Sequence, residues 1–136
     1  MRSQYVFAGI LSLCFCALLP VSGCGSNTKA GGSVTFSDGT PVDRGMVKFS
    51  DGQHQYTGQI NANGTFELGG LKPGDGLPPG TYRVSVIGAV GENDVPLVEA
   101  KYESSEESGI SFDVAKGRNE PFKITVERYK ASRSAQ

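Results

Sequence analysis

Cysteine, histidine and tryptophan are scarce in this sequence. None of its three cysteines follows Cys24, His54 is its only histidine, and tryptophan is absent. A disulfide, a thiolate metal site or a histidine cluster is therefore excluded from residues 25–136. A basic excess is missing too, since 13 Lys and Arg oppose 14 Asp and Glu. Nucleic acid, which binds to basic faces, is thus not an expected partner.

Glycine and proline are abundant, and no helical periodicity occurs outside the N-terminal apolar run. The 136 residues include 19 glycines and 7 prolines, which favour tight turns over long helices. Without residues 1–23, about 110 residues remain, which is enough for one hydrophobic core and too few for two.

The N-terminus has the pattern of a secretion signal. Arg2 precedes an apolar run without charge, residues 5–19, and Pro20 ends this run. The run is shorter than the roughly 20 residues that cross a bilayer as a helix. We therefore expect a signal peptide over residues 1–23 rather than a retained transmembrane anchor.

The end of this segment resembles a bacterial lipobox, in which an aliphatic residue and two small residues precede a cysteine. Here these residues are Val21, Ser22, Gly23 and Cys24. The resemblance implies cleavage between Gly23 and Cys24 and a lipid on the Cys24 thiol. Two or more acyl chains hold a protein to a bilayer stably. The alternative is an ordinary secretory signal whose cleavage site happens to contain a cysteine.

The residues after Cys24 predict where the protein is held. Gly25 is not the aspartate that retains enterobacterial lipoproteins in the inner membrane. By analogy, we expect the outer membrane, with the protein facing the periplasm or the exterior. Residues 24–32 combine the lipidated cysteine with a glycine-rich, flexible tether that reaches at most about 28 Å. The membrane is thus an expected partner through the lipid anchor.

Residues 33–128 alternate apolar and polar side chains with period two, which is typical of strands with one buried face. In the clearest run, Val84 and Val86 are expected to point inward and Arg83 and Ser85 outward. The pattern predicts an all-β domain, an antiparallel Ig-like or transthyretin-like β-sandwich of seven or eight strands. The runs are 33–36, 47–49, 56–60, 66–68, 81–88, 110–115 and 122–127, with a weaker one at 97–102 and a polar tail at 129–136.

Several motifs resemble carboxypeptidase regulatory-like domains, which have a transthyretin-like fold. They are Gly32-Ser33-Val34-Thr35, Asn63-Gly64-Thr65-Phe66 and Leu77-Pro78-Pro79-Gly80-Thr81-Tyr82. Small planctomycete-type envelope lipoproteins are similar over residues 32–127, and their recurring elements would be Lys101-Tyr102, Ser108-Gly109 and Gly117-Arg118-Asn119. The resemblance implies the fold and leaves the function open, because such domains accompany peptidases, transporters and adhesins.

No group of residues forms a recognisable catalytic, metal or cofactor site. His54 lies in a polar stretch with no second histidine or thiol to join it, so we expect it to be exposed. The acidic stretch 103–108 is expected to be a solvated loop. Four acids lack the spacing of a calcium loop and predict turns instead: Asp38, Asp51, Asp75 and Asp94.

Two chemistries of related folds are not expected. Hydroxyisourate hydrolases, a transthyretin-like enzyme class, use several histidines and end in Tyr-Arg-Gly-Ser, whereas this chain has Tyr129-Lys130-Ala131-Ser132. A Lys–Asn isopeptide crosslink, as in collagen-adhesin repeats, would need Lys48 and Asn119 to meet. Lys48 is predicted to point outward, and Asn119 lies in a turn.

The sequence thus predicts a membrane-tethered, non-enzymatic β-sandwich lipoprotein of the cell envelope. It would be a structural module or would bind an envelope protein or glycan, with loops 72–79 and 103–108 as candidate contact regions. The alternative is an accessory or regulatory subunit that docks on a larger envelope enzyme or export system. A hydrolase is the least favoured interpretation, and neither a cofactor nor a small-molecule substrate is expected.

Overall fold

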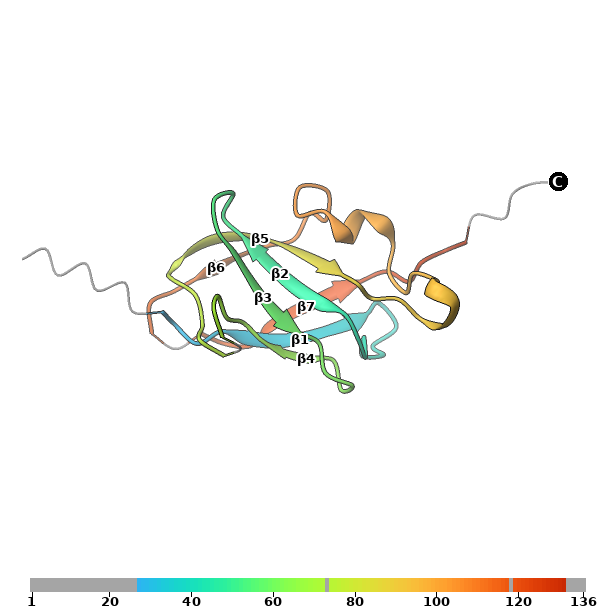
Figure 1. Ribbon diagram of the computed structural model, residues 1–136, viewed down its shortest axis with the longest axis horizontal. Helices are drawn as coiled ribbons and strands as arrows, with labels where there is room; N and C mark the ends of the chain where they lie inside the picture. The colour runs from blue at the N-terminus through green and yellow to red at the C-terminus, as the bar shows by residue number, and fades with distance from the viewer. Residues whose placement is uncertain (1–26, 73, 118, 132–136) are drawn as a thin grey trace, which may run out of the picture.

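The structure, a computed structural model, describes residues 27–72, 74–117 and 119–131 (Figure 1). Within these residues seven strands form a three-stranded sheet, β4-β1-β7, and a four-stranded sheet, β3-β2-β5-β6. The two sheets pack on each other, which confirms the predicted all-β sandwich. The strands are β1 (Gly31–Phe36), β2 (Met46–Ser50), β3 (Gln55–Gln59), β4 (Thr65–Glu67), β5 (Gly80–Ile87), β6 (Ser111–Val114) and β7 (Phe122–Val126); the 3₁₀-helices are η1 (Glu92–Asp94) and η2 (Ala100–Glu103).

The inward side chains of both sheets form one core around Phe49. This residue of β2 is fully buried, as the alternation predicts. Its ring lies 5.5 Å from the ring of Phe122 on β7 and 6.4 Å from that of Phe66 on β4, centroid to centroid. Tilted aromatic pairs at these distances are favourable beyond the apolar area that they bury. The aromatic contacts therefore join the four-stranded sheet to the three-stranded sheet.

One strand pair differs from the expected antiparallel arrangement. β1 and β7 are parallel, with Val34 beside Ile124. The reason is that β6 belongs to the four-stranded sheet and β7 to the three-stranded sheet, so their connection crosses the sandwich instead of closing a hairpin. β7 approaches β1 closely at Gly32, where a Cβ atom would overlap the Phe122 carbonyl oxygen. Glycine is required at this position of the strand pair.

The sandwich begins earlier than residue 33, the predicted start of the domain. Thr28 and Leu77 exchange two backbone hydrogen bonds, of 2.9 and 3.0 Å, and Ala30 is buried. Gly31 and Gly32 already belong to β1. The flexible tether predicted over residues 24–32 is therefore too long, because its last five residues pair with or pack against the sandwich.

The weak strand predicted over residues 97–102 is wrong. Only Val98 pairs with a strand end, beside Arg128, and the chain then forms η2. Val98 and Tyr102 are both buried, but Ala100, which would share their face in a strand, is exposed. The segment covers part of β5 instead of extending a sheet.

Because η2 and the loop after it lie over β5, some polar residues that were predicted to be exposed are buried. Ser85 on β5, predicted to point outward into solvent, is fully buried. Ser105 and Ser108 are buried as well, so the stretch 103–108 is only partly the solvated loop that was predicted. The Ser108 hydroxyl donates a hydrogen bond to the Val84 carbonyl, which fixes the loop to β5.

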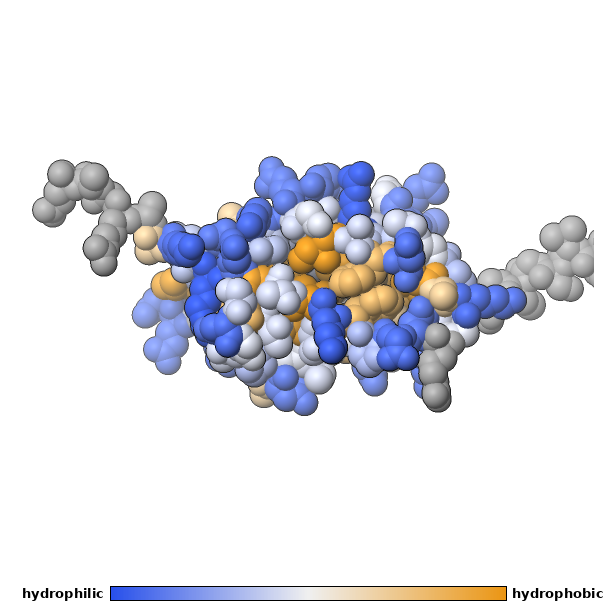
Figure 2. Space-filling model, turned by 180° about the vertical axis from the view of Figure 1, so that it is seen from behind, coloured by the Kyte–Doolittle hydropathy of each residue, from blue (hydrophilic) through white to orange (hydrophobic). Residues whose placement is uncertain are grey.

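Apolar side chains reach the surface where the sandwich is open between the edge strands β6 and β7. These strands pass behind β2 and β5 in Figure 1, and Figure 2 shows apolar atoms on that rear face, bordered by polar ones. Ile110 and Phe112 are only partly buried. The ring of Phe112 lies 4.9 Å from that of Phe122, so this opening is filled by aromatic packing and is not a cleft.

Candidate functional site

The predicted lipid-attachment residue, Cys24, lies outside the described residues, as do Gly23 and the whole predicted signal peptide. The described chain shows only where the following residues join the sandwich, at the pairing of Thr28 with Leu77. In the part of the chain that the structure describes, no helix has the length and apolar character needed to span a bilayer.

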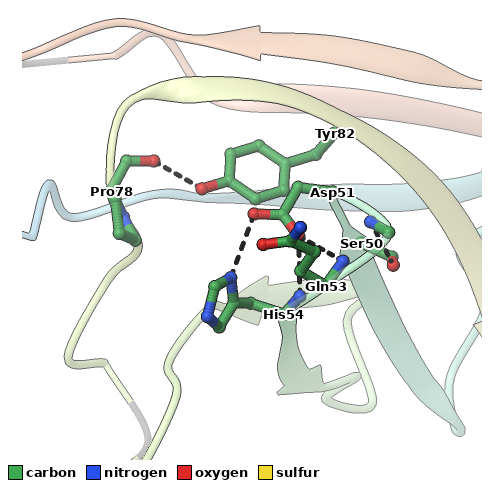
Figure 3. A network of polar contacts seen from close by, with 7 residues as sticks. Ser50, Asp51, Gln53, His54, Pro78 and Tyr82 are labelled. Carbon is green, nitrogen blue, oxygen red and sulfur yellow. Dashed lines mark hydrogen bonds and ion pairs between the residues drawn. The ribbon is translucent and has the colours of Figure 1, made fainter.

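The turn between β2 and β3 brings Asp51 and His54 together. Asp51 Oδ1 accepts hydrogen bonds from the backbone N–H groups of Gln53 (2.8 Å) and His54 (2.6 Å), and Oδ2 lies 3.3 Å from His54 Nδ1 (Figure 3). These bonds, first that of the His54 N–H, lower the pKa of the Asp51 carboxyl. The His54 side chain is 65% exposed, which confirms the prediction of an exposed histidine.

Serine, aspartate and histidine, the residue types of a hydrolytic triad, all occur in this turn. The Ser50 hydroxyl, however, accepts a hydrogen bond from the Gly52 backbone N–H (3.2 Å). Figure 3 shows Ser50 and His54 on opposite sides of Asp51. The Ser50 and Asp51 side chains therefore satisfy backbone groups of a tight turn, which is the local role that Ser and Asp commonly have, and the His54 ring contacts the Asp51 carboxylate.

Tyr82 closes the same end of the sandwich. Its hydroxyl donates a hydrogen bond to the Pro78 carbonyl (2.7 Å; Figure 3), and its ring meets that of Tyr56 edge-on at 5.8 Å. Burial raises the pKa of the Tyr82 hydroxyl. The hydroxyl thus remains a neutral donor that holds the segment before β5 against the core, a structural role.

A polar hollow of about 300 Å³ lies beside the β2–β3 turn. The turn contributes Asp51, β5 contributes Thr81 and Arg83, and the loop after η2 contributes Ser105 and Glu106. Arg83 is exposed, and none of the ion pairs found among the described residues includes it. The lining combines one guanidinium with two carboxylates and three hydroxyls, that of Ser50 included, and so offers both donors and acceptors to a polar ligand. Loop 103–108, a predicted contact region, contributes to this hollow.

The acids proposed as turn residues have that role where the structure shows their contacts. Asp38 Oδ1 accepts a hydrogen bond from the Thr40 N–H, and Asp75 Oδ2 accepts one from the Lys72 N–H. Asp51 does the same in its own turn. Among the residues described, no three His, Cys, Asp or Glu side chains are grouped as a metal ion would need.

The two residues weighed for an isopeptide crosslink have other surroundings. The Asn119 side-chain amide exchanges hydrogen bonds with the backbone of Ala115, at 2.9 and 3.0 Å. Lys48 alternates with the buried Val47 and Phe49 and so belongs to the outer face of its sheet. Tyr129, the first residue of the hydrolase-like tetrad, pairs through its N–H with the Leu97 carbonyl, while Ser132 lies outside the described residues.

The three recurring elements of the envelope-lipoprotein resemblance have structural roles. Lys101 Nζ lies 4.9 Å from the centroid of the buried Tyr102 ring and forms an ion pair with Glu127 (3.1 Å). Ser108 binds β5, as described above, and Asn119 ends the turn between β6 and β7. The sequence pattern did not predict the hydrogen bond from Ser108 to Val84, because Val84 belongs to a strand that is distant from Ser108 in the sequence.

Comparison of the chain with protein-family models, with curated proteins and with solved structures gives no match. The carboxypeptidase regulatory-like resemblance therefore remains a prediction based on short motifs.

Proposed function

We propose that this chain is a membrane-tethered, non-enzymatic β-sandwich lipoprotein of the cell envelope, held in the bilayer by a lipid on Cys24. One observation carries the proposal. A lipobox-like sequence, Val21 to Cys24, shortly precedes a compact sandwich in which Thr28 is the first of the described residues that pairs. An apolar N-terminal run that ends in such a motif serves export and acylation rather than the core of the domain.

The proposed tether is short. Gly25, Ser26 and Asn27 alone separate Cys24 from Thr28, so the two residues can be at most about 14 Å apart. The end of the sandwich at which Thr28 pairs with Leu77 would then remain at the bilayer surface. A partner of this module must therefore be reachable close to the membrane, as an envelope protein or a glycan is.

The non-enzymatic part of the proposal rests on how polar side chains are used. The Ser50 and Asp51 side chains accept hydrogen bonds from backbone N–H groups of one turn, and the His54 ring contacts Asp51. The Tyr82 hydroxyl donates to the Pro78 carbonyl in the segment before β5. The hollow around Arg83 offers hydrogen-bond donors and acceptors for recognition instead. We propose this hollow as the contact site for an envelope protein or glycan, and the outer membrane, from the residue after Cys24, as the location.

The proposal is tested by expressing the full chain in a bacterium that acylates lipoproteins, in the presence of labelled palmitate. The variant Cys24→Ser removes the proposed acceptor thiol, and Cys16→Ser removes a thiol from the predicted signal peptide as the matched control. We expect the label on the parent and on Cys16→Ser and its complete loss from Cys24→Ser. A labelled Cys24→Ser chain, or an unlabelled parent, would contradict the proposal.

A further inference from the structure

The point where the chain joins the sandwich is fixed against one loop, residues 69–76. The Leu68 N–H, just before this loop, donates to the Ala30 carbonyl (2.9 Å), and Leu77, just after it, pairs with Thr28. Gly74 lies beside Lys29 in the same surface depression. The loop therefore leaves and rejoins the sandwich next to residues 28–30, at the same end of the molecule as the start of β1 (Figure 1).

Leu71, in this loop, is 99% exposed, more than any other large apolar side chain among the described residues. The base of the loop is held in place, since Gly69 and Thr57 exchange two backbone hydrogen bonds. Gly70 then packs against the Tyr56 ring, at 3.4 Å from the position a Cβ would take. Isolated exposed apolar residues are common on protein surfaces, so the position of Leu71 decides whether it has a role.

That position is close to the proposed lipid. Leu71 can lie at most about 11 Å from Leu68, which is bound to Ala30, and Cys24 can lie at most about 14 Å from Thr28. Both residues are thus confined to the same end of the sandwich. If the acyl chains on Cys24 are in the bilayer, this end faces the headgroups.

Charge does not favour a purely electrostatic contact at this end. The exposed cations Lys29 and Lys72 are matched by the exposed anions Glu67 and Asp75, and Lys116, beside the Gly117 that donates to Thr28, adds one cation. Attraction to anionic headgroups is therefore weak, and an apolar side chain is the feature that a lipid surface would bind.

We propose that Leu71 inserts into the interfacial layer of the bilayer that holds the lipid anchor, as a second contact that fixes the orientation of the sandwich on the membrane. This inference rests on the proposed lipid anchor at Cys24. β5, about 26 Å long, then runs from the membrane end toward η1 at the far end. Val95, which follows η1 and is 49% exposed, would face away from the bilayer (Figure 1).

The absence of tryptophan from the sequence gives a direct test, because a single introduced tryptophan reports on one position. The variants Leu71→Trp and Val95→Trp are made in the full chain, purified with their lipid from an acylating host and placed in phosphatidylcholine vesicles with brominated acyl chains. Both sites are exposed and apolar, so Val95→Trp is a matched control. Fluorescence quenching by bromine is measured, and the intact mass of each protein reports its lipid.

We expect strong bromine quenching and a blue-shifted emission for Trp at position 71, and emission typical of water for Trp at position 95. The contact should persist in high salt, because it does not depend on charge. Equal quenching at both positions, or none at position 71, in a protein whose mass shows the lipid, would overturn this inference and leave the proposed function standing. A protein without lipid would overturn both.

Discussion

Ser85 on β5 and Ser108, which bonds to β5 from a later loop, are both buried. Among the described residues, only the Ser108 hydroxyl of the two has hydrogen-bond partners. Ser108 Oγ donates to the Val84 carbonyl and accepts from the Ile110 N–H. Ser85 Oγ has no partner among the described residues. Burying a hydroxyl without a partner costs about 1–3 kcal/mol, whereas losing a formed bond leaves its partner unsatisfied. The same substitution should therefore act in opposite directions at the two positions.

For Ser85→Ala we expect the free energy of unfolding to stay equal or to rise by up to about 1 kcal/mol, because an unpaired polar atom is removed. For Ser108→Ala, the matched control, we expect a fall of about 1–2 kcal/mol. Urea unfolding of the chain from Gly25 onward measures both. A loss at Ser85→Ala as large as that at Ser108→Ala would show that the Ser85 hydroxyl is paired.

At the residue scale, the sequence predicted which side chains bind the backbone of their own turn. It did not predict which side chains are buried beneath segments that come later in the chain. Asp38, Asp51 and Asp75 bind N–H groups in their own turns, so their roles follow from neighbouring residues. The burial of Ser85 depends on η2 and the loop after it, which come later in the chain. Alternation with period two distinguishes the two faces of a strand and does not show whether the outer face meets water.

Among the elements, the parallel pair β1–β7 depends most on a single residue. Gly32 faces Phe122, and a methyl group there would overlap the Phe122 carbonyl oxygen, which belongs to rigid backbone. Gly80, at the start of β5, has only ordinary contacts at the corresponding position, the nearest being the Tyr82 ring at 3.6 Å. The two glycines thus differ in what they allow.

We expect Gly32→Ala to lower the free energy of unfolding by about 1–3 kcal/mol or more, because the strands must move apart. Gly80→Ala should stay within about 0.5 kcal/mol of the parent. The midpoints of urea unfolding, with unchanged slopes, compare the two. Equal stability of both variants would mean that β1 and β7 are not paired as closely as described.

An ion pair joins the chain just after β1 to the chain just after β7, and these segments lie side by side because the two strands are parallel. Asp38, in the turn after β1, lies 3.1 Å from Nε of Arg128, just after β7, and the Arg128 guanidinium lies 3.8 Å from the centroid of the Phe36 ring. Hydrogen bonds from Thr40, followed by the interaction with Arg128, lower the pKa of Asp38 from 3.8 to about 2. The ionised carboxylate is therefore favoured by the folded state.

Because the pKa of Asp38 is lower in the folded state than its ordinary value, its stabilising contribution is present above pH 4. It is lost as the pH falls from about 4 to about 2. We expect the unfolding midpoint of Asp38→Asn to fall less across this interval than that of the parent, since the titrating group is gone. Asp94→Asn, at an exposed acid of η1, is the control and should follow the parent. Parallel pH profiles for Asp38→Asn and the parent would contradict this assignment.

At the scale of elements, the sequence predicted strands well and their partners less well. The hairpin between β2 and β3 and the turn between β3 and β4 are marked by Asp51-Gly52 and by Asn63-Gly64, whereas β5 and β6 are joined by a long connection that contains η1 and η2. The parallel partner of β1 is β7, at the other end of the chain, and no turn signal connects them. The strand predicted at 97–102 is wrong because residues 100–103 form η2, which leaves Ala100 exposed between the buried Val98 and Tyr102.

For the whole molecule, the pairing of Thr28 with Leu77 matters most, because it shortens the link between the sandwich and the proposed lipid. A long flexible tether would let the domain turn freely above the membrane. If Cys24 has the proposed lipid, a link of about 14 Å at most would hold the loop that bears Leu71 at the bilayer and direct η1 away from it.

The central claim is that a lipid on Cys24 keeps this sandwich at a membrane. Intact-mass measurement of the chain extracted with detergent from its native membranes tests it most directly, with N-terminal fragmentation to locate the first residue. The account predicts a chain that begins at Cys24 and exceeds the mass of residues 24–136 by a diacylglyceryl group, with or without a further acyl chain. A chain that begins at another residue, or that has the mass of its unmodified sequence, would contradict it.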